Sequence, residues 1–328
     1  MRSPGTLGEV SLRPRSRRLG RPVASAAPAG PGSGDTPIPE QAWHRVPAEE
    51  LIALVSRILV AHGFPEIRAR MAAEALCHGD LTGAPDTGVA ELTRLHLPAV
   101  ESGFVTPGAE PLLIADRGAA ALIDYRRASG LWAVGDAMDR AVVRAGRFGV
   151  GLVSMRGAGP FGRAGHHAAR ALPHGMIGLV LAAGGVEEHP ANPLGMAAPA
   201  GAYPEFMLDV NLGDAARNPE FAGFALMVDV LAGVLSGVAD HEHDTGLLVM
   251  AIAPTTLRSA DGFYRAASAL FGSMLGWEGG APIRYPGWRE AQYLEQCRAL
   301  GVPLSASVRR QLDSLAIGLG RSPLSTVG

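Results

Sequence analysis

The stretch Met155-Arg156-Gly157-Ala158-Gly159-Pro160-Phe161-Gly162-Arg163-Ala164-Gly165 decides how the fold is interpreted. It contains a Gly-x-Gly-x-x-Gly pattern, which follows a predicted strand at 149–155 and opens a predicted helix at 163–172. Such a pattern is typical of a dinucleotide-binding turn, where glycines let the backbone approach a pyrophosphate. However, residues 182–184 at the end of the next strand are Ala-Ala-Gly, without the acid that would contact the ribose. Because 43 glycines also make chance matches common, a Rossmann site is not the favoured interpretation.

Composition indicates a globular protein with one large domain or two modest ones. The chain has 328 residues, of which 47% are hydrophobic and 18% charged, with a net charge of −2. This balance gives no basic footprint for nucleic acid. All 29 basic residues are arginine, which excludes a Schiff-base lysine, a lysine general base and a P-loop lysine.

Three further features bear on location and ligands. Cys77 and Cys297 lie outside any Cys-x-x-Cys motif, which fits a reducing compartment and predicts a cytoplasmic protein. The longest apolar run, 221–238, carries Asp229 at its centre and predicts a buried helix rather than a membrane span. The sequence His-Glu-His-Asp at 241–244 has a metal-ligand composition, but its loop context predicts a solvated charged segment, so no metal is expected.

The first forty residues differ from the rest. Arginines alternate with proline, glycine and serine, and Glu9 is the only acid before Asp35. Such a segment cannot bury enough apolar surface to offset its chain entropy. We therefore predict a disordered leader over 1–40, with an organelle transit peptide as the alternative.

Hydrophobic periodicity predicts helices near both ends of the folded part. Helical patterns occupy 47–63, 65–78 and 91–102, strands and helices alternate over 119–252, and helical patterns return at about 260–275, 288–300 and 305–316. The order predicts an α+β fold with helical N- and C-terminal parts around a β-containing centre.

Several motifs, taken in order, resemble the type-2 malate/L-lactate dehydrogenase family. This family includes malate, sulfolactate and ureidoglycolate dehydrogenases and reductases of diketogulonate and cyclic imino acids. Residues 155–165 resemble its strand, Asn-Ser-x-His-Phe-Gly-x-x-Gly turn and helix, and 80–89 its Asp-Leu-Arg-Gly-x-Asp-Ser-His-Gly-Val loop. Residues 191–193 resemble its Thr-Asn-Pro, 206–209 its strand ending in aspartate, and 285–287 its Pro-Gly before the last helices.

The resemblance covers about 46–318 and implies a malate/L-sulfolactate dehydrogenase-like fold, not a Rossmann fold. It further implies NAD(P) as cofactor, a small-molecule ligand and a homodimer, with neither a nucleic acid nor a membrane as partner. We expect 46–118 and 253–318 to form a helical substrate and dimer domain. Residues 119–252 would then form a shortened cofactor-type domain, because only 210–219 remain where the family carries several dozen residues.

The hydride-transfer residues that the resemblance implies are mostly replaced. Pro160 stands where the family has its acid/base histidine, and a proline can neither donate nor accept a proton. Asp86 and Thr87 occupy the positions of the serine and histidine in the Ser-His loop. Glu91 replaces the arginine that pairs with a substrate carboxylate and reverses the charge there. The family's Lys-Gly near the cofactor aligns near Glu220-Phe221.

Other residues remain as candidates for the site. The resemblance implies cofactor contacts for Asn192, Pro193 and Asp209, and Asp209 either orients a ligand or caps the loop after its strand. His166 and His167 lie one turn into the helix after the altered turn, and either can replace the lost acid/base group. The pocket candidates are Asp86, Thr87, Glu91, Pro160, Phe161 and Arg163, the last as an anion ligand or a solvent-directed side chain.

Three functions fit these replacements. In the first, the chain is a divergent NAD(P)-dependent oxidoreductase of 2-hydroxy or 2-oxo acids that uses substitute residues. Alternatively, it is a repurposed non-redox enzyme for a small biosynthetic intermediate, or a catalytically silent binding partner. Fold resemblance alone does not decide among them.

Removal of residues 1–40 tests the leader. Because the segment offers no apolar stripe that can dock, we expect a chain beginning at Gln41 to keep the melting temperature of the full chain. Differential scanning calorimetry of the two chains measures this. A fall of several degrees in the shorter chain would mean that the segment belongs to the fold.

Overall fold

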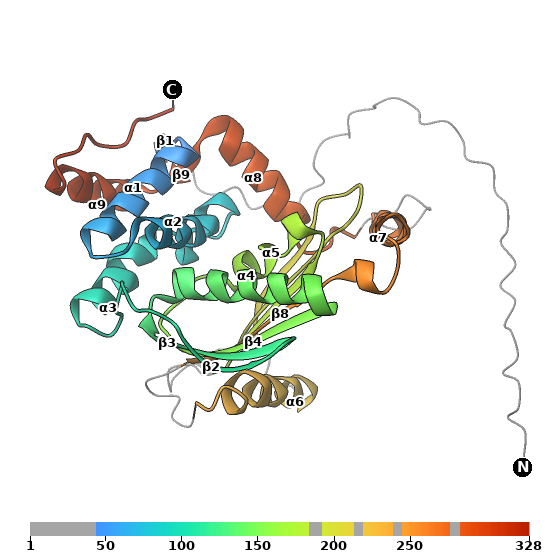
Figure 1. Ribbon diagram of the computed structural model, residues 1–328. Helices are drawn as coiled ribbons and strands as arrows, with labels where there is room; N and C mark the ends of the chain where they lie inside the picture. Colours follow the sequence, from blue (N-terminus) through green and yellow to red (C-terminus); the bar gives the residue numbers. More distant parts are fainter. Residues whose placement is uncertain (1–43, 184–191, 213–218, 239–244, 276–282, 328) are drawn as a thin grey trace, which may run out of the picture. The chain divides into compact units, whose positions relative to one another are not determined.

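A seven-stranded mixed sheet forms the centre of the described chain (Figure 1). The protein is represented by a computed structural model that describes residues 44–183, 192–212, 219–238, 245–275 and 283–327. The strands lie in the order β2-β3-β4-β8-β5-β6-β7. Their bounds are β2 (Leu112–Arg117), β3 (Ala120–Ala128), β4 (Val150–Ala158), β5 (Ile177–Ala183), β6 (Pro193–Ala198), β7 (Phe206–Asn211) and β8 (Thr245–Ile252).

The connectivity of the sheet is not that of a Rossmann fold. Strands β4 and β5 flank the glycine-rich turn, but β8 lies between them and pairs antiparallel with both. In this sheet only β3 and β4 pair in parallel. A dinucleotide-binding βαβ unit requires neighbouring parallel strands on both sides of its helix. The prediction of an α+β fold without a Rossmann domain is therefore confirmed.

Helices cover both faces of the sheet (Figure 1). Helices α4 (Gly130–Phe148) and α5 (Ala164–Ala169) lie on one face, while α6 (Pro219–Val228) and the π-helical turns Asp229–Val234 lie on the other. Glycines allow the close approach of α4 and α5. A Cβ at Gly151 would stand 1.9 Å from the Ala141 carbonyl oxygen, and one at Gly178 would stand 2.0 Å from that of Ala168.

The N-terminal and C-terminal helices meet beside the sheet. Strand β1 (His44–Val46) pairs antiparallel with β9 (Val302–Leu304), which joins the two ends of the described chain. Helix α1 packs on α2, and both contact the last helices. The remaining elements are α1 (Ala48–Ala61), α2 (Glu66–Leu81), the 3-10 turn Pro85–Thr87, the π-helical turn Leu92–His96, α3 (Leu97–Glu101), the 3-10 turns Leu172–His174 and Pro254–Thr256, α7 (Ala260–Met274), α8 (Trp288–Leu300) and α9 (Ala306–Gly318).

Helix α1 shows why these segments form helices. Its apolar side chains recur at helical spacing, and Leu51, Val55, Ile58 and Leu59 are completely buried. Gly63 follows the helix in the left-handed region, at φ +90°, where glycine is favoured. The helix predicted over 47–63 is confirmed.

Several elements differ from the sequence expectations, among them β1 and β9, for which no strand was expected. Strand β2 was not expected, because it is an edge strand whose exposed residues show no alternation of apolar and polar side chains. Strand β6 was not expected either, because Pro193 and Gly195 are residues that strands disfavour. The helix expected over 163–172 is shorter: α5 ends at Ala169, and Pro173, which lacks an N–H, lies in the 3-10 turn that follows.

Some expectations lie outside the described residues. These are the leader 1–40, Ala191 of the Asn-Pro motif, the 241–244 segment and the side chains of Glu220 and Phe221. The proposed division into a helical domain and a cofactor-type domain stays a prediction.

The C-terminal tail is fixed to α9 by a buried arginine and to the N-terminal part of the fold by two backbone amides. The Arg309 guanidinium donates to the carbonyl oxygens of Leu324 and Ser325 and forms an ion pair of 2.8 Å with Asp313. The Ser325 amide donates to Glu50 of α1 at 2.7 Å, and the Val327 amide donates to the Arg45 carbonyl at 2.9 Å. These contacts hold residues 324–327 across α9, α1 and β1.

We expect Arg309→Ala to lower the free energy of unfolding by about 2 kcal/mol, because it leaves buried acceptors without a donor. Urea denaturation measures the change. The matched control is Arg310→Ala, an exposed neighbour that donates to the Ala306 carbonyl of its own helix, with an expected change below about 0.5 kcal/mol. If Arg309→Ala lowered the free energy of unfolding no more than Arg310→Ala does, the contacts of Arg309 with the tail would contribute nothing to stability.

Candidate functional site

The glycine-rich turn between β4 and α5 is shaped by contacts within the chain. Gly157 and Gly162 adopt φ values of +69° and +72°, in the region that favours glycine. A Cβ on Gly157 would stand 2.8 Å from the Arg126 amide nitrogen, and one on Gly159 would stand 2.7 Å from the Val105 side chain. These glycines therefore make room for neighbouring parts of the protein. Pro160, between them, carries no group that can transfer a proton.

Asp209 joins β7 to the beginning of α5. Its Oδ2 accepts a hydrogen bond from the Gly165 amide at 3.1 Å and another from Arg163 Nε at 3.1 Å. Burial raises the pKa of Asp209, while the Arg163 guanidinium and the Gly165 amide oppose that rise. The structure thus brings the two predicted site residues Asp209 and Arg163 together. It pairs them with each other, so Arg163 is neither the solvent-directed side chain nor the free anion ligand of the two sequence interpretations.

His167 faces the protein interior. Its ring is completely buried, and Nε2 lies 2.8 Å from the carbonyl oxygen of the buried Phe161. Burial lowers the pKa of His167 to about 4, so the ring is neutral at physiological pH. Its Nδ1 has no hydrogen-bond partner among the described residues. His167 therefore supports the turn from inside and does not reach a cavity.

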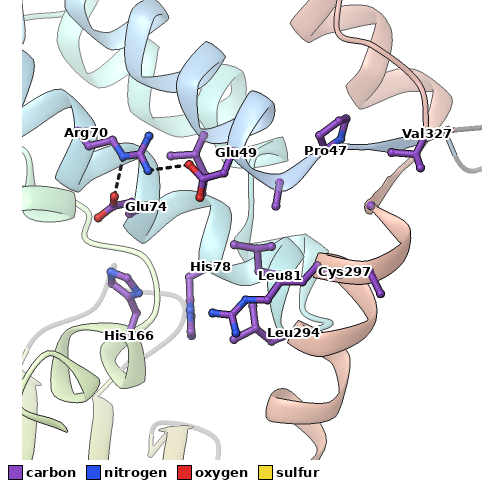
Figure 2. Close-up of a pocket in the computed structure, with 15 residues that line it drawn as sticks. Pro47, Glu49, Arg70, Glu74, His78, Leu81, His166, Leu294, Cys297 and Val327 are labelled. Carbon is purple, nitrogen blue, oxygen red and sulfur yellow. Dashed lines mark hydrogen bonds and ion pairs between the residues drawn. The ribbon is translucent and has the colours of Figure 1, made fainter. Parts of the chain in front are cut away.

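His166, the next residue along the helix, faces a cavity of about 670 Å³ (Figure 2). We call this the His78–His166 cavity. It lies between α1, α2, α5, α8 and the C-terminal tail, and its polar lining comprises Glu49, Arg70, Glu74, His78, His166 and Arg298. The buried thiol of Cys297 also lines it.

The rings of His78 and His166 lie side by side, with centroids 4.8 Å apart. Burial lowers the pKa of His78 to about 3, helped by the positive charge of Arg163, and burial lowers the pKa of His166 well below its ordinary range. Neither ring has a hydrogen bond with any residue that the structure describes. Each neutral imidazole therefore offers one N–H donor and one acceptor nitrogen to a molecule in the cavity.

The loop after α2 is held by a buried carboxylate that sequence reasoning had not singled out. Asp80 Oδ2 accepts a hydrogen bond of 2.7 Å from the Val89 amide, and a Cβ on Gly88 would collide with this carboxylate at 2.1 Å. Asp86 is exposed, and Thr87 donates its hydroxyl to the Ala84 carbonyl at 3.0 Å. Neither Asp86 nor Thr87 lines the His78–His166 cavity.

Glu91 is neutralised by its own helix. Arg94 NH2 lies 3.0 Å from Glu91 Oε1, one turn further along. His96 Nε2 is 4.0 Å from Glu91 Oε2, but burial lowers the pKa of His96 to about 4, so this histidine adds no positive charge. The local repulsion that the sequence predicts from Glu91 is therefore compensated by Arg94, a residue that the motif comparison did not consider.

The positions that the resemblance implies for NAD(P) are occupied by contacts within the chain. The Asn192 side chain is buried and donates to the Ala225 carbonyl at 3.0 Å and to Asp229 Oδ1 at 3.1 Å. Pro193 begins β6 and has no N–H to offer. The Asp209 carboxylate is bound by Arg163 and Gly165. The side chains of Asn192 and Asp209 are therefore already engaged within the chain, and Pro193 offers no N–H donor to a nicotinamide cofactor.

Of the cavity's polar lining residues, the sequence analysis named only His166 and missed Glu49, Arg70, Glu74, His78 and Arg298. His78 lies two residues before Asp80 on α2, outside any motif, and Arg298 follows Cys297 on α8. No local signal distinguishes them, because they approach His166 only through the packing of α2 and α8. Among the described residues, no group of three or more histidine, cysteine or acidic side chains is placed to hold a metal ion. The same residues contain no helix long and apolar enough to cross a membrane.

Comparison with known proteins gives the class. A family model for malate/L-lactate dehydrogenase matches residues 46–219 and 222–313. The malate dehydrogenase of Pyrococcus abyssi is 33% identical over a match 262 residues long, and the match includes 62% of this chain and 72% of that protein. The 2,3-diketo-L-gulonate reductase of Escherichia coli is 31% identical over 135 residues, covering 41% of this chain and 40% of the reductase.

Solved structures agree on the fold. The malate dehydrogenase of Pyrococcus horikoshii superposes with a TM-score of 0.77 at 24% identity, covering 86% of this chain and 97% of that one. The sulfolactate dehydrogenase of Methanocaldococcus jannaschii gives a TM-score of 0.74 at 21% identity, covering 85% and 98%. The chain belongs to the malate/L-lactate dehydrogenase family, whose members are dehydrogenases and reductases, and this supports an oxidoreductase function.

The chain is also shorter than the Pyrococcus abyssi enzyme within the region that the two share. The match to the Pyrococcus abyssi enzyme is 262 residues long. It includes only 62% of this chain, and 62% of 328 residues is fewer than 262. That relative therefore carries residues inside the match that have no counterpart here, as expected for an internal deletion.

The buried Asp80 predicts a pH dependence of stability. Burial raises its pKa from the ordinary 3.8 to about 7. Between these values the folded protein holds a proton that the unfolded chain has released. The contribution of Asp80 to the free energy of unfolding therefore falls as pH rises from about 4 to 7, by up to roughly 4 kcal/mol, against the rise that the buried histidines with lowered pKa contribute over the same range.

Urea denaturation of the parent protein and of Asp80→Asn between pH 4 and 8 isolates this contribution. We expect the stability of Asp80→Asn to increase relative to that of the parent protein as pH rises, because the amide cannot ionise but its oxygen can still accept from Val89. Asp86→Asn, an exposed change in the same loop, is the matched control and should keep the slope of the parent protein. Equal slopes for Asp80→Asn and the parent would show that Asp80 is not the titrating group.

Proposed function

We propose that this family member performs acid–base chemistry on a small polar molecule in the His78–His166 cavity. In this proposal, His166 with His78 takes the proton-transfer role that Pro160 cannot perform. The observation that carries it is the pair of neutral, adjacent imidazoles that line the cavity without a partner among the described residues. Of the replacement histidines expected from the sequence, the proposal selects His166, because His167 is buried against Phe161.

The chemistry of the pair follows from its environment. A neutral imidazole can donate its N–H to a carbonyl or carboxylate oxygen, or accept a proton at its other nitrogen. The low pKa values disfavour a charged imidazole in the empty cavity. A bound anion would raise the pKa of a neighbouring histidine and so favour its protonated form. Proton transfer at His166 is therefore linked to occupation of the cavity.

Hydride transfer by the family's usual arrangement has less support. Pro160, the paired Asp209 and the buried Asn192 leave no proton donor in the turn and no free cofactor ligand at these positions. The missing internal segment further reduces what can cover a cofactor. These observations favour the non-redox alternative over an active NAD(P)-dependent dehydrogenase. A cytoplasmic location and a homodimer remain expectations.

Proton NMR in D2O tests the proposal with pyruvate, oxaloacetate, L-malate and L-leucine. We expect exchange of the hydrogen next to the carbonyl or carboxylate for at least one of them. His166→Gln should slow this exchange by about 10²-fold, since general acid–base catalysis typically contributes about 10²–10⁴-fold. Oxidation of NADH or NADPH with pyruvate, oxaloacetate or a cyclic imino acid should stay below an enzymatic rate, and Pro160→His should not restore it. The control variant is His44→Gln, which replaces an exposed histidine.

Two outcomes would contradict the proposal. Nicotinamide-dependent turnover by the unmodified protein would show that the dehydrogenase function persists. Absence of exchange with every compound, together with unchanged melting temperatures in their presence, would favour a catalytically silent binding partner.

A further inference from the structure

The His78–His166 cavity carries an excess of negative charge on one side. Arg70 of α2 forms ion pairs with two carboxylates, Glu49 of α1 at 3.0 Å and Glu74 of α2 at 2.6 Å (Figure 2). One guanidinium compensates only one of them, so the cluster Glu49–Arg70–Glu74 retains one negative charge. The Glu49 side chain is 80% exposed and the Glu74 side chain 37%, so both remain accessible to a ligand at the rim.

The opposite charge lies on the α8 side of the same cavity. Arg298 follows the buried Cys297 on α8, and both residues line the cavity. Arg298 is exposed and has no hydrogen bond or ion pair with any described residue. Figure 2 shows the acidic cluster on the side of α1 and α2, and Leu294 and Cys297 of α8 on the other side. The rim is therefore polarised, with a negative side and a positive side.

The wall between these charges has both polar and apolar parts. His78 and His166 supply the neutral imidazoles described above, while Leu81 and Leu294 supply apolar surface. A volume of about 670 Å³ lies within the range of small-molecule sites. A single anion would meet Arg298 but also the excess negative charge, and a single cation would leave Arg298 unpaired.

We propose that the cavity binds a small zwitterion of the amino-acid type with an apolar body. Its carboxylate lies at Arg298, its ammonium group lies at the Glu49–Arg70–Glu74 cluster, and the carbon between them faces the histidine pair. Each charge of the ligand then meets its complement, which neither a simple carboxylate nor a simple amine achieves. This inference rests on the proposed function for the role of His166, but the recognition itself depends only on the charges of the rim.

The contribution of each charged group is modest and measurable. Ion pairs at an exposed rim are screened by water and salt, and each changes a dissociation constant by up to about fivefold. Specificity for the zwitterion therefore comes from two contacts acting together. It should weaken as the salt concentration rises, because exposed charges are screened.

Isothermal titration calorimetry with three matched probes tests the inference. These are L-leucine, 4-methylpentanoate, which lacks the ammonium group, and 3-methylbutylamine, which lacks the carboxylate. We expect L-leucine to bind the full chain with a dissociation constant about fivefold lower than that of either analogue. Arg298→Gln should weaken L-leucine and 4-methylpentanoate but not 3-methylbutylamine. Glu49→Gln should weaken L-leucine and 3-methylbutylamine and strengthen 4-methylpentanoate.

Matched controls and the contrary results are defined by the same probes. Arg310→Gln and Glu295→Gln change exposed charges that do not line the cavity, and they should leave all three dissociation constants unchanged. Equal binding of 4-methylpentanoate and L-leucine, insensitive to Glu49→Gln, would overturn the zwitterion in favour of a simple anion. Equal binding of 3-methylbutylamine and L-leucine, or no binding of any probe, would also overturn the zwitterion proposal.

The two proposals fail separately. Loss of L-leucine specificity in the rim variants, with no proton exchange anywhere, would support the zwitterion and reject acid–base catalysis. Proton exchange of pyruvate or oxaloacetate that depends on His166 but not on Arg298 or Glu49 would support the catalysis and reject the zwitterion.

Discussion

The carboxylate of Asp209 fixes the beginning of α5 against the sheet, and the geometry of the site depends on this contact. Its Oδ2 binds the Gly165 amide and Arg163 Nε, both at 3.1 Å. Gly195, the register partner of Asp209 on β6, allows the approach, because a Cβ there would stand 2.2 Å from the Ala164 carbonyl carbon. The helix is short, so its direction is set by this anchored end. Removal of either the carboxylate or the glycine would displace both histidines of α5.

The anchored helix gives two neighbouring histidines different environments. Consecutive residues on a helix point about 100° apart, so one can face the core while the next faces a cavity. His167 supports the carbonyl of Phe161 from inside, whereas His166 meets His78 across the space between α5 and α2. Because burial keeps both neutral, neither needs a counter-ion in the folded protein. The free-energy cost of burying these histidines is lower because their rings are neutral.

Several polar groups at the family-like positions of the scaffold are engaged within the chain. Asp209 and Asn192 make hydrogen bonds within the chain, and the carboxylate of Glu91 is paired with Arg94. Buried polar groups are stable only when they find partners, and a group whose partners lie within the protein is no longer free for a ligand. His78, His166 and Arg298, by contrast, line one cavity beside α8 and have no hydrogen bond or ion pair with a described residue. The proposed function rests on these three groups.

The sequence by itself determined the fold class, because the order of motifs and the alternation of helical and strand periods survive in local residues. The helical spacing of Leu51, Val55 and Ile58 was enough to predict α1. The identity of Pro160 was enough to predict that the turn lacks a proton donor. Local patterns did not predict β2, which is an exposed edge strand, or β6, which contains a proline and a glycine. The pairing of Asp209 with Arg163 and the meeting of His78 with His166 were decided only by tertiary structure. The pairing of Glu91 with Arg94, three residues further on, is local. Residues 88 positions apart in the chain share no local signal, and only the packing of α2 against α5 places their rings 4.8 Å apart.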